Sequence, residues 1–217
     1  MRLMLAMAWL ASVVFCSAPA AQEAPAGQDS PSSHIPNLLE SIRFDQPVRF
    51  CDIPIPTSDQ QVKERLEKEV LLALWDRPQV ILWIKRASRF FPVIEPILKE
   101  HGLPDDLKYV PVIESALRPH ASSVKNAVGY WQFLRATGRR YGLRIDSYVD
   151  DRRSLLKSTH AACRYLKDLN KMFNSYLLAV SAYNMGEFGL KKEIQAQNNK
   201  DFFTLYLPLQ TQRYAFK

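Results

Sequence analysis

The chain has 217 residues, of which 47% are hydrophobic, and it carries a formal net charge of +7 at pH 7. This length and apolar content suffice for one domain of ordinary size plus extensions. The basic residues are scattered rather than gathered in one run, which argues against nucleic acid as a partner. The positive excess suits an anionic polymer or a membrane surface, although it also serves plain solubility.

Residues 1–20 have the features of a secretory signal peptide. A short basic start precedes a hydrophobic run from Leu3 to Phe15, and Ser17 to Ala20 offers an Ala-x-Ala cleavage pattern. The run is shorter than the roughly 20 apolar residues that span a bilayer. We therefore expect an exported protein of the periplasm or cell envelope. Its association with the envelope membrane after processing stays open.

Cysteine and histidine usage bears on bridges and metals. An exported compartment permits a disulfide between Cys51 and Cys163, whereas two buried free thiols are the alternative. Neither a CxxC nor an HExxH motif occurs. The four histidines lie far apart in the sequence, so we expect no metal and no other cofactor: His34, His101, His120 and His160.

The first part of the mature chain divides into two segments. Residues 21–57 are predicted to be a linker followed by an irregular stretch. Residues 21–35 are rich in Gln, Ser, Pro and Ala, whereas residues 36–57 mix apolar residues with Pro54 and Pro56. Residues 58–91 are predicted to be a helical N-terminal extension. The pattern Ser58-x-x-Gln61 resembles a capping box that opens one helix, and a second helix is expected from Pro78 to Phe91.

Residues 92–217 are predicted to form a second, helical domain. Pro92 is expected to start a helix that ends at Gly102, and Pro104 with the two acidic residues after it is a strong helix start. Pro111 should bend that helix. Further helices are expected over 131–141, 152–173 and 176–183. Alternating β-branched runs are too short for more than a minor strand, which predicts an all-α fold with at most a small hairpin.

The most informative stretch runs from Leu103 to Gln132. It places one carboxylate, Glu114, at the end of an apolar helical segment and next to Ser115. A carboxyl that leaves an apolar helix for a polar cleft has a raised pKa, and it can donate a proton to a leaving oxygen near neutral pH. The alternative is an ordinary surface glutamate at a helix C-terminus.

Three separated segments carry residues that can meet in one cleft: Glu114-Ser115, Gly129 to Gln132, and Ala182 to Gly186. Together and in this order they resemble the lytic transglycosylases of the goose-lysozyme-like superfamily. The resemblance covers roughly residues 92–214 and includes a late segment, Leu207-Pro208-x-x-Thr211-x-x-Tyr214. It implies a lysozyme-like helical domain over 92–217.

The chain departs from the family pattern at three places. Asn126 stands where a glycine is usual, and Arg135 stands where a proline is usual. Asparagine tolerates positive φ, so the turn can survive. Tyr130-Trp131 replaces the commoner Leu-Met before Gln132, and we expect these rings to form an aromatic wall that stacks on a sugar.

The resemblance implies a substrate and a reaction. The substrate is the glycan strand of peptidoglycan, cut at the β-1,4 bond from N-acetylmuramic acid to N-acetylglucosamine, and the product carries a 1,6-anhydro ring. Glu114 acts first as an acid and then as a base, while the sugar's own C6 hydroxyl is the nucleophile. Two alternatives stay open: a hydrolytic muramidase, with Glu187 or Asp151 as weak candidates for a second acid, and a non-catalytic peptidoglycan-binding protein.

The resemblance also implies roles for four further residues, each beside a structural alternative. Tyr183 is expected to hydrogen-bond Glu114, or else is a core tyrosine. Ser123 and Gln132 are expected to contact sugar or acetamide groups, or else make hydrogen bonds within the loop. Asn184 either fixes the turn that presents Tyr183 or touches the substrate. Ser115 is expected to tie the loop.

The protein as a whole is expected to be a monomer.

Overall fold

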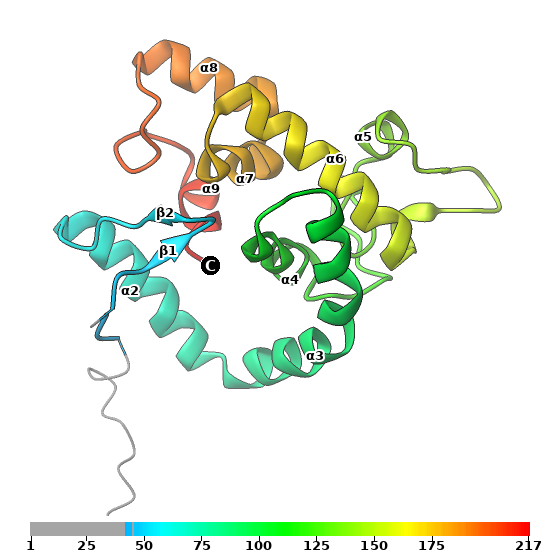
Figure 1. The fold of residues 1–217 in the computed structure, drawn as a ribbon, viewed down its shortest axis with the longest axis horizontal. Helices are drawn as coiled ribbons and strands as arrows, with labels where there is room; N and C mark the ends of the chain where they lie inside the picture. The colour runs from blue at the N-terminus through cyan, green and yellow to red at the C-terminus, as the bar shows by residue number, and fades with distance from the viewer. Residues whose placement is uncertain (1–41, 45) are drawn as a thin grey trace, which may run out of the picture. The chain divides into compact units, whose positions relative to one another are not determined.

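A computed structural model describes residues 42–44 and 46–217 (Figure 1). The predicted signal peptide and most of the predicted linker lie outside the described residues. The described part contains eight α-helices, two short 3₁₀-helices and one two-stranded hairpin. The predicted all-α class with a small hairpin is therefore confirmed. Within the described residues, every helix is too short or too polar to cross a membrane.

The chain enters the described part through a hairpin followed by two helices. Strand β1 (Arg49–Phe50) pairs antiparallel with β2 (Ile53–Pro54), inside the stretch predicted to be irregular. Helix α2 (Gln60–Trp75) begins one residue later than the predicted capping box, because the Asp59 carboxylate accepts the backbone N–H groups of the first turn.

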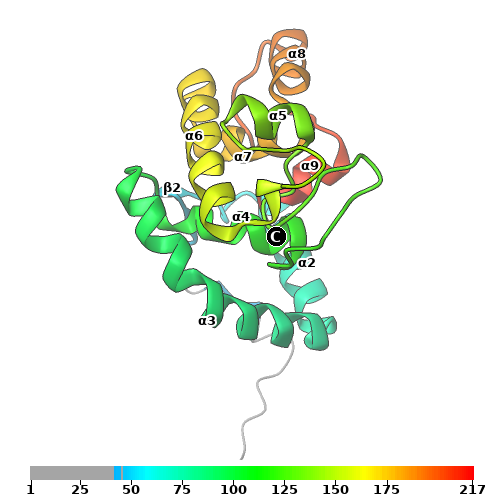
Figure 2. The ribbon, with the colours of Figure 1, turned by 90° about the vertical axis from the view of Figure 1, so that its right-hand side faces the viewer.

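Helix α3 (Arg77–Glu100) replaces the two helices predicted from Pro78 to Phe91 and from Pro92 to Gly102. It is one continuous helix across Pro92 and Pro96, so the division between 58–91 and 92–217 falls inside a helix. An internal proline removes a backbone donor and bends the helix, and α3 curves along its length in both views (Figures 1 and 2). Burial of Ile94, Ile97 and Leu98 on the C-terminal half offsets the lost hydrogen bonds.

The segment that carries Glu114 is a 3₁₀-helix, η1 (Asp105–Tyr109), followed by helix α4 (Val110–Ser115). Pro111 lies in the first turn of α4, where its missing N–H needs no partner. It therefore marks the change from 3₁₀- to α-helix and does not bend a longer helix as predicted. Two consecutive residues in the left-handed region, Ala116 (φ 51°) and Leu117 (φ 56°), then end α4 abruptly.

The remaining helices build the centre of the domain. They are α5 (Arg135–Arg140), the 3₁₀-helix η2 (Asp151–Arg153), α6 (Leu155–Phe173), α7 (Tyr176–Met185), α8 (Glu187–Gln197) and α9 (Leu209–Tyr214). Helices α6 and α7 lie side by side in both views, with α8 and α9 against α7 (Figures 1 and 2). Their inward side chains are fully buried, including Leu166, Leu169, Leu178 and Val180. Cys51 and Cys163 are both free and buried.

The loop between α4 and α5 is held by one buried arginine. Arg152 is 5% exposed, and its guanidinium donates to the carbonyl oxygens of Asn126 (3.0 Å) and Phe133 (3.1 Å). Asp150 pairs with the same guanidinium at 2.7 Å. Gly129 has φ +86°, and a Cβ placed on it would lie 1.9 Å from the Arg152 carbonyl oxygen. The loop therefore closes tightly over η2.

This close approach yields a prediction for Gly129→Ala. We expect it to lower the free energy of unfolding by about 3 kcal/mol or more, because it adds a steric clash with backbone to the strain of a positive φ. Gly102→Ala is the matched control: Gly102 also has a positive φ (+62°), but nothing lies within 4 Å of its added Cβ. It should cost about 1 kcal/mol. Urea denaturation measures both, and equal losses would contradict the packing described.

Candidate active site

Glu114 lies at the C-terminal end of α4 and receives a hydrogen bond from α9. The Tyr214 hydroxyl donates to its carboxyl Oε1 at 2.7 Å. Burial raises the pKa of Glu114 to about 7, against the opposing effects of the Tyr214 hydrogen bond and the Lys217 charge. Near neutral pH a large fraction of this carboxyl is therefore protonated, in the kind of environment that the sequence predicted.

Ser115 fastens the end of α4 to the neighbouring loop. Its buried hydroxyl lies 2.8 Å from the Tyr130 carbonyl oxygen and 3.0 Å from that of Pro111, and it accepts the backbone N–H of Arg118. These contacts hold the segment Gly129 to Gln132 beside Glu114. Ser115 ties the loop, as expected.

The predicted hydrogen bond from Tyr183 to Glu114 is not formed. The Tyr183 hydroxyl donates to the Trp131 carbonyl oxygen at 2.7 Å, and the phenol that bonds Glu114 is Tyr214. Tyr183 is nevertheless near the carboxylate: burial raises its pKa most, and the Glu114 charge raises it further. The sequence did contain a signal for Tyr214, in the family-like segment 207–214, but no role was predicted for that residue.

The predicted aromatic wall is also wrong. Trp131 is 0% exposed and Tyr130 is 7% exposed, so neither ring is available to stack on a sugar. The Trp131 indole N–H donates to the Thr159 hydroxyl at 2.9 Å, and the Tyr130 ring packs edge-on against Phe90. A buried indole with a satisfied donor is a core residue.

Gln132 and Ser123 are engaged within their loop. The Gln132 amide group donates to the carbonyl oxygens of Gly129 (2.9 Å) and Ala121 (3.1 Å). The Ser123 hydroxyl accepts the backbone N–H of Ala127 at 3.1 Å. Both residues therefore shape the loop, which was the structural alternative in each case.

Asn184 belongs to the contacts that hold α9. Its side-chain oxygen accepts the buried Thr211 hydroxyl at 3.0 Å, which joins the end of α7 to α9. On the other side, the Arg213 guanidinium forms a two-pronged ion pair with Glu69 of α2, whose side chain is also buried. Tyr214 follows directly, so these contacts set the position of its hydroxyl.

The two weak candidates for a second acid are committed elsewhere. Glu187 is in the first turn of α8, where it pairs with Arg140 (2.8 Å) and accepts the Tyr165 hydroxyl (2.9 Å). Burial raises the pKa of Glu187, but hydrogen bonds from its own N–H and from these two partners outweigh it, so the pKa lies below the ordinary value. Asp151 pairs with Lys157 at 2.8 Å.

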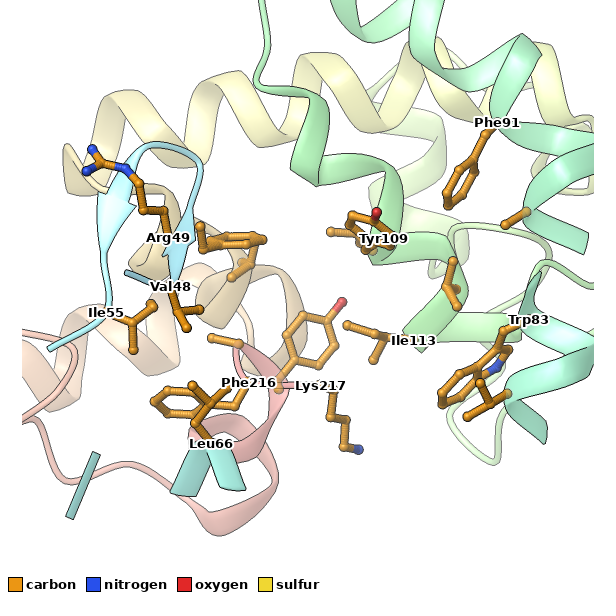
Figure 3. A pocket seen from close by; sticks show the side chains of 18 of the residues that line it. Val48, Arg49, Ile55, Leu66, Trp83, Phe91, Tyr109, Ile113, Phe216 and Lys217 are labelled. Carbon is orange, nitrogen blue, oxygen red and sulfur yellow. The ribbon is translucent and has the colours of Figure 1, made fainter. Parts of the chain in front are cut away.

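A cavity of about 430 Å³ adjoins the site from the α9 side (Figure 3). Its walls come from the hairpin, α2, α3, the segment before Glu114 and the chain end, and they are mostly apolar. Trp83, Tyr109 and Phe216 point into it in the close-up. Tyr214 lines this cavity while its hydroxyl bonds Glu114, but Glu114 is not one of the lining residues.

The fold also brings together two histidines that are far apart in the sequence. His101 Nε2 and His160 Nδ1 lie 3.0 Å apart. Sequence separation was therefore a poor guide to which histidines meet.

Residues 91–205, more than half of the chain, match the family model of the transglycosylase SLT domain. The chain belongs to the transglycosylase SLT domain family. The matched span contains Glu114 and the four further residues predicted for the site, but it begins inside α3 and ends before α9. Glu69 and Tyr214 therefore support the SLT site from outside the matched span.

Two of three curated relatives of this SLT domain chain are named as transglycosylases. It is 40% identical over 137 residues to membrane-bound lytic murein transglycosylase D of Escherichia coli (strain K12), which covers 61% of this chain and 30% of that protein. This chain is also 32% identical to an Alteromonas sp. (strain M-1) protein named for tributyltin chloride resistance. That match runs over 123 residues and covers 55% of this chain and 59% of the relative. This chain is 35% identical to peptidoglycan transglycosylase gp16 of Escherichia phage T7. That match runs over 104 residues and covers 46% of this chain and 8% of the relative.

The partly buried acid of this SLT domain, Glu114, yields a prediction about stability. The unfolded chain ionises Glu114 near its ordinary pKa of 4.5, whereas the folded chain ionises it near 7. The folded state therefore binds more protons in this window, and stability falls as the pH rises through it. Glu114→Gln removes that loss, so we expect the variant to be more stable at pH 8 by up to about 3 kcal/mol. At pH 4 it should show no such gain.

Urea unfolding of both proteins at the two pH values measures this difference. Glu187→Gln is the matched control, because its pKa is lowered by its partners. That variant should lose stability at pH 8. A Glu114→Gln variant with no gain at pH 8 would contradict the raised pKa.

Proposed function

We propose that this chain is a lytic transglycosylase that cleaves the β-1,4 bond between N-acetylmuramic acid and N-acetylglucosamine in peptidoglycan and leaves a 1,6-anhydromuramoyl product. Membership of the SLT domain family and the names of two relatives support the reaction class. The observation that carries the proposal is one partly buried carboxyl, Glu114, with a pKa of about 7 and a hydrogen bond from Tyr214.

Glu114 serves as the acid in the first half of the reaction. In its neutral form it donates a proton to the glycosidic oxygen as the bond to the muramic acid C1 breaks. The carboxylate that results keeps the hydrogen bond from Tyr214, which stabilises the charged form. In the second half this carboxylate takes the proton of the C6 hydroxyl while the C6 oxygen bonds to C1. The carboxyl is then neutral again.

One carboxylate is enough for this route. Glycosidases that use water or form a covalent intermediate need a second carboxyl group some 5 to 9.5 Å from the first. Here Glu187 and Asp151 are held in ion pairs. The C6 hydroxyl belongs to the same sugar as the reacting carbon, so its effective concentration is very high without a second base.

The other predicted site residues fit supporting roles in this proposal. The Gln132 amide N–H groups bond the loop, and its amide oxygen is left for a sugar amide or hydroxyl. Ser123 is on the exposed rim of the same loop and is proposed to contact sugar there. Tyr183 fixes the Trp131 carbonyl before Gln132, and Asn184 fixes α9 through Thr211.

The location follows from the substrate. Peptidoglycan lies in the cell envelope, and the predicted signal peptide would take the chain there. The E. coli relative is named membrane-bound. We propose that this chain acts in the periplasm or at the envelope, with glycan strands as its partner.

The first functional test uses Glu114→Gln on purified sacculi, with the products identified by mass spectrometry. We expect wild-type protein to release anhydro-muropeptides and the variant to lose activity by about 10²- to 10⁴-fold, because it cannot donate the proton. Glu64→Gln, on the exposed face of α2, is the control and should retain full activity. A fully active Glu114→Gln variant would sink the proposal.

The mass of the products separates the alternatives. Hydrolysis adds one water that anhydro products lack, so hydrated products would identify a muramidase. Binding to sacculi without turnover across a pH series would identify a non-catalytic protein.

Tyr214→Phe tests the hydrogen bond to the acid. The protonated form of Glu114 is the active one, so kcat/KM should fall as the pH rises through about 7. Tyr214 lowers the pKa of Glu114, so its loss should move this descending limb to higher pH, by roughly one unit. Tyr183→Phe, which breaks a bond to Trp131 and not to Glu114, should leave the limb in place. Equal shifts in both variants would contradict the assignment.

A further inference from the structure

A second cluster of chemically competent side chains joins α3 to α6. His101 follows the last residue of α3, and His160 is in the first half of α6. Their facing ring nitrogens are 3.0 Å apart, and the rings are tilted by 59° with centroids 5.2 Å apart. The rings therefore meet through their nitrogens rather than stacking. Ligand atoms of Glu100 and of the two histidines all lie within 4.8 Å of one another.

These donors match a zinc-type ion. Two imidazoles and one carboxylate, with a fourth position open to water, form a known ligand set of Zn²⁺. Zn–N distances of 2.0–2.1 Å in tetrahedral geometry place two nitrogens roughly 3.3–3.4 Å apart. The observed 3.0 Å needs to open by only a few tenths of an ångström. Hard ions such as Mg²⁺ and Ca²⁺ prefer sites made entirely of oxygen.

The three ligands are held by packed helices, and the charges around them both favour and oppose a cation. Buried residues flank the ligands on both helices, with Ile97 and Leu98 before His101 and Ala161 and Ala162 after His160. Ligands on packed helices are held more precisely than ligands on loops. The C-terminal end of α3 favours a cation. The positive charges of Arg164 and Lys167 are close enough to His101 to oppose the binding of a cation. An ion held here must therefore bind imidazole strongly, as zinc does.

We propose that Glu100, His101 and His160 bind one Zn²⁺ ion, which clips the C-terminal end of α3 to α6. The site uses none of the residues assigned to glycan cleavage, so it stands whether or not the proposed function does. Its expected effect is on stability, because an ion that binds only the folded chain stabilises it by mass action.

Isothermal titration tests the site. The protein is purified without a histidine tag, stripped with EDTA and titrated with ZnCl₂. We expect one saturable site in the wild type and a melting temperature that rises by roughly 5–10 °C at a Zn²⁺ concentration 100 times Kd. Titration with Co²⁺ gives an independent readout, since its visible absorption reports nitrogen and oxygen ligands.

Three variants decide the outcome. His160→Ala should weaken Zn²⁺ binding by at least about tenfold. Glu100→Gln should weaken it too and is safe for the fold, because Glu100 is exposed. His120→Ala, which removes a histidine outside the cluster, should bind like the wild type. Wild-type protein without a saturable site, or equal affinity in the wild type, His160→Ala and Glu100→Gln, would overturn the proposal and leave only a hydrogen bond between two histidines.

Discussion

The hydrogen bond from Tyr214 to Glu114 is the constraint on which the rest of the site depends. It joins α9 to α4 across 100 residues of sequence. A single phenol can hold a partly buried carboxyl only if its own helix is held, and α9 is held twice. Thr211 bonds Asn184 at the end of α7, and Arg213 pairs with Glu69 of α2. The helical extension before the matched family span thereby helps to position the acid.

Burial raises the pKa of Glu114, and it also lowers the stability of the folded protein when Glu114 is ionised. The same desolvation that raises its pKa to about 7 makes the ionised form unfavourable in the folded protein. Tyr214 moderates this cost, because its hydrogen bond favours the carboxylate. Near neutral pH Glu114 is therefore poised between two protonation states, which the proposed role as acid and then base requires.

The loop beside the acid is pre-formed by contacts that do not involve a substrate. Arg152 bonds two of its carbonyl oxygens, and Ser115 lies within hydrogen-bonding distance of a third, that of Tyr130. Gly129 permits the close approach to η2. Two left-handed residues, Ala116 and Leu117, end α4 immediately after Ser115. Backbone held in such conformations needs support from its surroundings, and these contacts supply it.

The sequence by itself determined the helical class, the carboxylate at the end of an apolar helix and the family, because helical periodicity and short motifs are local properties of the chain. The sequence also predicted that Ser115 ties the loop. Only the tertiary structure decided that Tyr214 rather than Tyr183 bonds Glu114, that Trp131 is core, and that His101 meets His160. Those outcomes depend on side-chain direction and on contacts between distant segments, which residue type and spacing do not encode. The continuity of α3 through Pro92 has the same origin, since burial against the rest of the domain outweighed a local helix-breaking preference.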